Sequence, residues 1–249
     1  MNALPVDLLH KYSMLPTDEI MDGIELAIIR VMEQTHRTPA SAIFEPETGM
    51  VWVTLLGSDQ FSTVDLTRTK RKTKRRLLDE IERELMRRQT IAEANYYHTL
   101  TRTAVTGTVR TRRGNDLEID LEVMDGLKQI NLTALCPPAH QTAKDYHRGA
   151  YASGRPLTFY ALSARPVENS RQSWVRVIVS RKARELPSRM LESLTGLSGI
   201  RCIKRNAGNK SIIITRHPLP KSAVNTVGKE LMETIEVTCP GGGKPYFRS

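Results

Sequence analysis

The feature that most constrains this chain is a change in hydrophobic period near residue 100. Between residues 69 and 98, Leu78, Ile81 and Leu85 recur at spacings of three and four, which predicts one long helix. From residue 104 the period becomes two, and apolar residues strictly alternate with acidic ones over 116–123. A helix of this length can close a first domain and act as a rigid arm to the strand-rich part that follows.

The segment before the long helix predicts a second helix and a hairpin. Residues 17–35 form an amphipathic pattern, with Ile20, Ile24 and Ile28 on one face. Two strand-like stretches follow at 41–44 and 50–56, separated by a turn sequence. Together with the long helix they predict an N-terminal domain over residues 1–100.

The middle of the chain predicts a small barrel. Five short strands are expected, with a short helix or loop at 137–147 between the third and the fourth. This pattern fits a five-stranded OB-type barrel over residues 101–182. The expected strands are 105–111, 116–124, 127–132, 157–164 and 174–180.

The last part predicts one small α+β unit over residues 183–240, followed by a flexible Gly- and Pro-rich tail at 241–249. The whole chain is therefore expected to be an α+β multidomain protein. The elements expected in this unit are a helix at 185–195, strands at 199–204 and 210–215, a helix at 221–232, and a strand at 234–238.

Charge is distributed unevenly along the 249 residues, whose formal net charge is +10. Residues 1–66 contain three Lys or Arg and ten Asp or Glu, so the remainder carries a net charge of +17. Such segregation indicates two surfaces with different partners. The basic part favours phosphate backbones, and the acidic part favours a protein.

Several classes of protein lack support in the sequence. We expect no signal peptide, no membrane span, no disulfide framework and no zinc site, because the apolar runs are short and the three cysteines are widely spaced. The six histidines are scattered, no nucleophile motif is present, and the P-loop pattern fails at Gly241–Lys244. We therefore expect a cytoplasmic protein that is not an enzyme and that needs no metal or other cofactor.

The order of parts resembles the NusA family of bacterial transcription elongation and termination factors. Three stretches carry the resemblance. They are Leu15–Ile20 with the helix expected at 17–35, Thr103–Arg110 directly after the long helix, and Val177–Arg181 before the helix expected at 185–195. The resemblance implies a polymerase-binding N-terminal domain, an RNA-binding barrel and a KH domain. It also implies a factor that acts in elongation, termination or antitermination. The expected partners are multisubunit RNA polymerase, RNA and other transcription factors, and the free protein is expected to be a monomer.

The last unit departs from the family pattern. A KH domain holds RNA with a GxxG loop between two helices. Here Arg216–Pro220 leads directly into a single helix, and Gly196–Gly199 precedes the first strand of the unit, where it predicts a turn. Only one such unit fits in the remaining length. We therefore describe it as a degenerate KH-like unit.

Candidate binding residues follow from the charge pattern. For polymerase, the candidates are the acidic residues of the first helix: Asp18, Glu19, Asp22 and Glu25. A dense basic run over residues 68–76 is a further candidate for phosphate or acidic-protein contact. For RNA, the candidates are Arg110, Arg112, Arg113, Lys128, Arg181, Lys182, Arg184, Arg201, Lys204, Arg205, Lys210, Arg216 and Lys221.

Two alternatives remain open at this level. A cap subunit of an RNA-degrading ring also combines an N-terminal domain, a barrel and a KH unit, but its N-terminal part is mainly strand. A metal-dependent nuclease would use the carboxylates of Asp116, Glu118, Asp120 and Glu122, which share one strand face. The simpler interpretation of those four residues is a solvated polar face.

Overall fold

The computed structural model describes residues 11–45, 50–55, 62–63, 70–125, 128–169 and 172–240. It confirms the predicted α+β class. The chain divides into two compact units, one of residues 1–95 with 166–175, and the other of residues 96–165 with 176–249. The expected turn at 46–49 and the expected tail lie outside the described residues.

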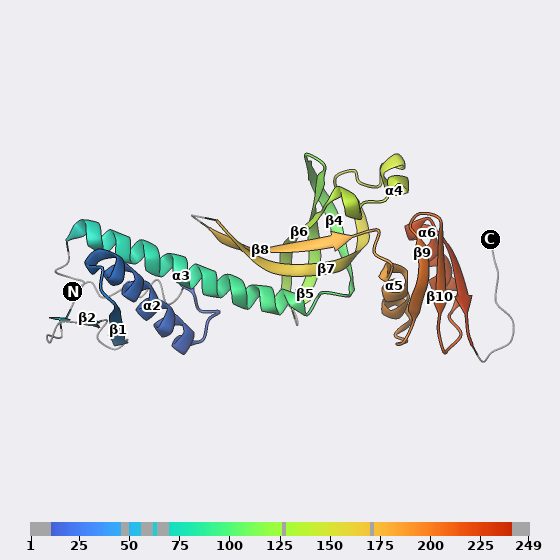
Figure 1. Cartoon of the computed structure of the whole chain (residues 1–249). Helices are drawn as coiled ribbons and strands as arrows, with labels where there is room; N and C mark the ends of the chain where they lie inside the picture. Colours follow the sequence, from blue (N-terminus) through green and yellow to red (C-terminus); the bar gives the residue numbers. More distant parts are fainter. Residues whose placement is uncertain are drawn as a thin grey trace. The chain divides into compact units, whose positions relative to one another are not determined.

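The first unit pairs two helices with a small sheet. Helix α2 (Thr17–His36) and helix α3 (Arg71–His98) lie side by side, as Figure 1 shows. Strands β1 (Ala40–Glu45), β2 (Met50–Leu55) and β3 (Ser62–Thr63) form an antiparallel sheet in that order. The core joins one face of each helix to one face of β1 and β2. It includes Ile24, Ile28, Phe44, Val53, Leu77, Ile81 and Leu85.

A buried carboxylate joins the two helices of the first unit. Glu84 of α3 is almost fully buried, and its oxygens pair with Arg30 of α2 at 2.7 Å, Arg87 at 3.3 Å and Arg88 at 3.2 Å. Burial opposes ionisation of Glu84, but hydrogen bonds from Arg87 and Arg30 outweigh it and lower the pKa of the carboxyl. Sequence periodicity gave no sign of this charge in the apolar stripe of α3.

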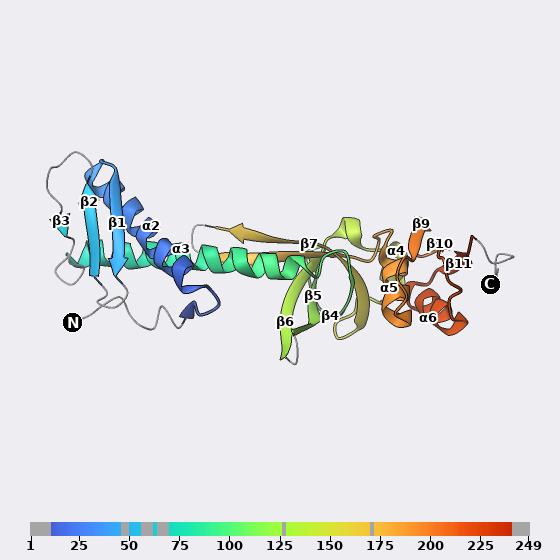
Figure 2. The ribbon, with the colours of Figure 1, turned by 90° about the horizontal axis from the view of Figure 1, so that it is seen from below.

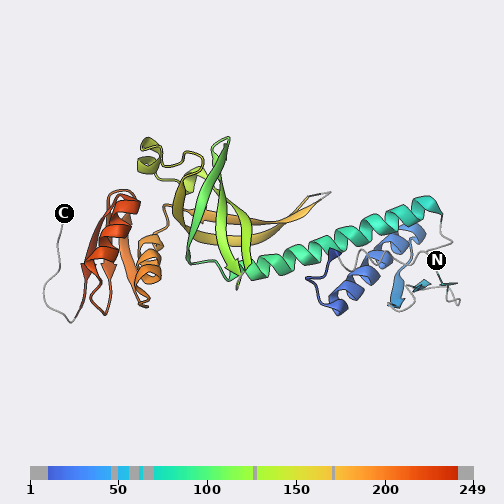
Figure 3. The ribbon, with the colours of Figure 1, turned by 180° about the vertical axis from the view of Figure 1, so that it is seen from behind.

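Five strands of the second unit close into a barrel, in the order β4-β5-β6-β8-β7. Figures 1 and 3 show these strands from opposite sides. Between the third and fourth strands lie a 3-10 turn (Pro138–His140) and the short helix α4 (Ala143–His147). The strands are β4 (Ala104–Arg113), β5 (Asp116–Asp125), β6 (Lys128–Cys136), β7 (Pro156–Glu168) and β8 (Ser173–Ser180).

The barrel follows the alternation expected from the sequence. Leu117, Ile119 and Leu121 of β5 are buried, and the acidic residues between them face outward. Gly107 of β4 lies against β5 so closely that a Cβ there would stand 2.7 Å from Ile119 Cγ2 and 2.8 Å from Leu121 Cδ2. The glycine in the Thr103–Arg110 stretch is therefore required by packing.

The last elements of the second unit are α5 (Leu186–Thr195), β9 (Arg201–Asn206), β10 (Lys210–Ile214), α6 (Lys221–Leu231) and β11 (Thr234–Thr238). Strand β10 lies between β9, its antiparallel neighbour, and β11, its parallel neighbour. Figure 2 shows α5 and α6 on one side of these strands. Their shared core includes Leu186, Leu191, Ile213, Val227 and Ile235.

Arg181, just after β8, joins the barrel to the last elements. Its side chain is 1% exposed and pairs with Asp145 of α4 at 3.0 Å and Glu230 of α6 at 3.3 Å. It also donates to the Thr158 carbonyl at 2.6 Å. Burial disfavours the charge of Arg181, but the charge and hydrogen bond of Asp145, together with the charge of Glu230, raise the pKa of the guanidinium. One side chain therefore fixes α4, β7 and α6 to one another.

We predict that Arg181→Met destabilises the second unit by about 3–5 kcal/mol, because it leaves Asp145 buried without its cation. Urea unfolding monitored by circular dichroism would measure the loss. The matched control is Lys182→Met, which removes an exposed cation at the next position. The double variant Arg181→Met/Asp145→Leu should recover part of the loss. Equal stability of Arg181→Met and Lys182→Met would contradict the assignment.

We predict that the Glu84 network makes the first unit sensitive to acid. Because the folded pKa of Glu84 is lowered, its contribution is fully present above the unfolded value of 4.5 and is lost as the pH falls through the folded value. Glu84→Gln should therefore lower stability at neutral pH and flatten its decline in acid. Thermal unfolding of both proteins between neutral and acidic pH tests this, and parallel curves would refute it.

Candidate functional site

Most of the cations predicted to bind RNA are on the surface of the second unit. Two surfaces hold six of them, the β4–β5 hairpin and the uncovered face of the β9–β11 sheet. The exposed ones are Arg110, Arg112, Arg113, Lys182, Arg184, Arg201, Lys204, Lys210, Arg216 and Lys221.

Two of the predicted RNA-binding residues are buried, and the prediction was wrong for both. Arg181 is enclosed by Asp145 and Glu230, as described above. Arg205 has a side chain that is 2% exposed and pairs with the fully buried Glu233 at 2.7 Å. Each guanidinium is saturated by internal acceptors, so neither can contact a phosphate. The side chain of Lys128 lies outside the part that the structure describes.

A bulge in β9 gathers cations on the uncovered face of the last sheet. Lys204 pairs with Ile212 and Cys202 pairs with Ile213, so Ile203 is an extra residue between them. In a regular strand, Arg201 and Lys204 would face opposite sides of the sheet, because they are three residues apart. The bulge instead places both on the face of Ile212, opposite the helices.

The same face carries apolar side chains between its charges. Ile212 and Ile214 are half-buried there, and Ile203 at the bulge is 51% exposed. Lys210 adds a further cation, which pairs with Glu236 of β11 at 2.5 Å. We call this surface, made of residues Arg201, Lys204, Lys210, Ile212 and Ile214, the basic sheet face. Its cations suit a phosphate backbone, and its isoleucines suit apolar contact with the bases or sugars.

The β4–β5 hairpin forms the other cationic surface. A two-residue loop joins the strands, and Gly114 in it has a φ of +63°, a conformation that glycine adopts readily. Arg110 lies at a register shift in the pairing of β4 with β5. Its Nε lies 3.8 Å from the carboxylate of Asp120. Arg112 places its guanidinium 5.2 Å from the ring centre of Tyr146 in α4. Sequence reasoning missed Tyr146, because nothing in the chain indicates that α4 lies against this hairpin.

The carboxylates considered for metal binding form a polar strand face. Asp120 is engaged by Arg110 and accepts a hydrogen bond from Thr133 at 3.3 Å. In the described part of the chain, no group of three or more His, Cys, Asp or Glu side chains could hold a metal ion. Burial raises the pKa of the Cys136 thiol to about 12, so this cysteine stays protonated at neutral pH.

The acidic residues of α2 that are candidates for polymerase binding differ in how freely a partner protein could reach them. Asp18, Glu19 and Asp22 are exposed in the first unit. Glu25 instead accepts a hydrogen bond from the Phe44 backbone at 2.9 Å, which ties α2 to β1. Asp18 and Glu19 lie in the first turn, where the helix dipole favours negative charge.

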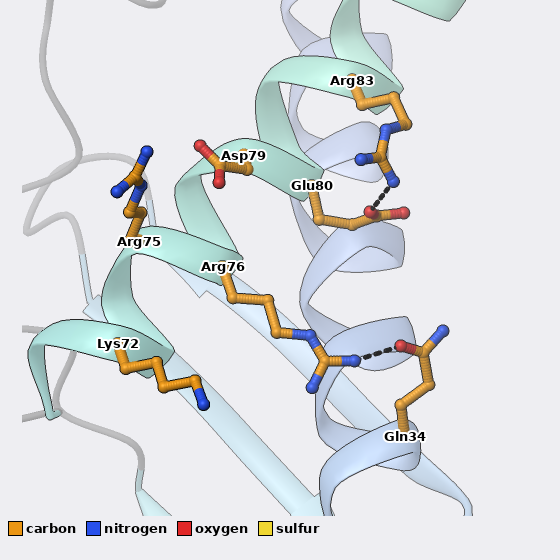
Figure 4. A pocket seen from close by; sticks show the side chains of 7 residues that line it. All are labelled: Gln34, Lys72, Arg75, Arg76, Asp79, Glu80 and Arg83. Atoms are coloured by element: carbon orange, nitrogen blue, oxygen red, sulfur yellow. Dashed lines mark hydrogen bonds and ion pairs between the residues drawn. The ribbon is translucent and has the colours of Figure 1, made fainter. Parts of the chain in front are cut away.

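The basic run at the start of α3 lines a hollow of about 330 Å³ in the first unit. Figure 4 shows Arg76 bonded to Gln34 of α2, and Arg83 paired with Glu80 at 2.6 Å. Arg75 and Lys72 stand at the same hollow, together with Asp79. The carboxylates partly neutralise these cations, so the site is weaker for phosphate than the sequence suggested. Arg68 of the run lies outside the described residues.

No family model matches the chain, and neither does any curated protein. Across the residues covered by the structure, no helix is both long and apolar enough to cross a membrane.

We predict that Arg201→Gln/Lys204→Gln weakens binding of single-stranded polynucleotides by the full chain and lowers the salt slope by about 1.4, or about 0.7 for each lost phosphate contact. The control, Arg165→Gln/Arg176→Gln, removes two exposed cations from β7 and β8 of the barrel. Fluorescence anisotropy across a salt series would measure both. If both pairs lower affinity and slope equally, the basic sheet face has no special role.

Proposed function

We propose that this protein is a non-enzymatic, RNA-binding accessory factor of a multisubunit RNA polymerase in the cytoplasm. In this proposal it is a shortened NusA-type factor that modulates elongation, termination or antitermination. The first unit would dock on polymerase through the exposed carboxylates of α2, and the basic second unit would guide nascent RNA. The observation that carries the proposal is the separation of charge between exposed carboxylates on α2 and exposed cations of the second unit.

The order of elements supports the finer fold assignment within this proposal. Five strands with a helix between the third and the fourth suit an OB-type barrel. The order α5-β9-β10-α6-β11 suits a KH-like unit that has lost one helix and the GxxG loop between its helices. We propose that the basic sheet face takes over the RNA contact that the missing loop would make.

The competing functions receive less support. A cap subunit of an RNA-degrading ring would have a mainly stranded N-terminal part, whereas α2 and α3 have 20 and 28 residues here. A nuclease would need the carboxylates of β5 to converge, but they lie along a strand whose alternate residues pack the barrel core.

We predict that Asp18→Asn/Glu19→Gln/Asp22→Asn in the full chain reduces retention of bacterial core RNA polymerase at least about tenfold, since about 1.4 kcal/mol of lost attraction has that effect. RNA affinity should not fall. The matched control is Asp116→Asn/Glu118→Gln/Glu122→Gln, which removes three charges from the barrel. A pull-down at fixed salt compares them. Undiminished retention by the α2 variant would refute the docking role, and a wild-type chain that holds neither polymerase nor RNA would refute the function.

A further inference from the structure

Tyr146 is an exposed aromatic side chain in cationic surroundings. Tyr146 is 54% exposed, and the Arg112 guanidinium lies 5.2 Å from the centre of its ring. The ring of His147 meets it edge-on, with centroids 5.9 Å apart and an interplanar angle of 76°. An exposed aromatic ring beside a guanidinium group is typical of sites for unpaired bases with their phosphates.

The short helix that carries Tyr146 is firmly anchored. The adjacent residue, Asp145, is buried against Arg181 at 3.0 Å and receives a hydrogen bond from the Thr142 hydroxyl at 2.8 Å. Lys144 donates to the carbonyls of Gly208 at 2.7 Å and Met232 at 3.1 Å. Because the two residues that precede Tyr146 are held by these contacts, its backbone has a fixed position on the second unit. A preorganised ring loses little conformational entropy when it binds a ligand.

We infer that Tyr146 is a base-stacking residue, and that one unpaired RNA base packs on the stack of Tyr146 and Arg112. This inference rests on the proposed RNA-binding function. The Arg112 guanidinium would hold the neighbouring phosphate or extend the stack, since guanidinium planes and aromatic rings both pack on bases. The phenol hydroxyl has no required role, because stacking uses the face of the ring. Binding at this position would tolerate any base.

The test compares Tyr146→Ala with Tyr146→Phe in the full chain. Each protein is titrated into a fluorescent single-stranded oligouridylate and into a matched oligonucleotide whose central positions are abasic. Stacking is worth about 1–3 kcal/mol per base, so Tyr146→Ala should weaken binding to the base-bearing strand about 5- to 150-fold. Tyr146→Phe should stay within about twofold of wild type. All three proteins should bind the abasic strand with similar affinity.

The outcomes separate this inference from the proposed function. Wild-type affinity of Tyr146→Ala for oligouridylate would overturn base stacking while leaving RNA binding intact. An equal loss on both strands would also overturn it, because it would show that the substitution disturbs the cationic surface. If the wild-type chain bound neither strand, the RNA-binding function and the stacking role would fall together. Thermal unfolding of each variant confirms that the fold is unchanged.

Discussion

The buried Arg181 guanidinium is the interaction on which the second unit depends. Its charge is stable inside the protein because Asp145, Glu230 and the Thr158 carbonyl surround it. These acceptors come from α4, β7 and α6. A hydrophobic contact would tolerate sliding, whereas a guanidinium with fixed donors sets direction as well as distance. The arrangement therefore determines where α4, and with it Tyr146, stands beside the barrel.

Buried ion pairs recur as a means of fixing elements in this chain. Glu84 holds three arginines at the α2–α3 contact of the first unit, and Glu233 holds Arg205, Ser211 and the Gly208 backbone in the last sheet. With an aromatic content of only 5%, the protein has few aromatic side chains to lock its contacts. Carboxylates paired with arginine supply directional contacts in their place. Some of the arginines therefore stabilise the fold and are not available to bind a partner.

The cations that remain on the surface are arranged by strand irregularities. The extra residue Ile203 brings Arg201 and Lys204 to one face, and the register shift at Arg110 interrupts the ladder beside the acidic face of β5. Bulges redirect side chains without changing the order of strands. The basic sheet face and the Arg112–Tyr146 stack can thus attract a phosphate backbone, while the carboxylates of β5 repel it. In the proposed function, this separation would favour a defined path for a single strand over uniform coating of the surface.

Hydrophobic periodicity alone determined the positions of helices and strands, because an element that buries one face repeats apolar residues at its own period. The alternation from Leu117 to Val123 and the three-four spacing from Ile20 to Ile28 predicted a strand and a helix that the structure confirms. Charge segregation also follows from the sequence. Only the tertiary structure decided that Arg181 and Arg205 are internal, that a bulge places Lys204 beside Ile212, and that Tyr146 meets Arg112. The sequence does not distinguish an arginine that faces water from one that pairs with a buried carboxylate, because the partner lies far away in the chain.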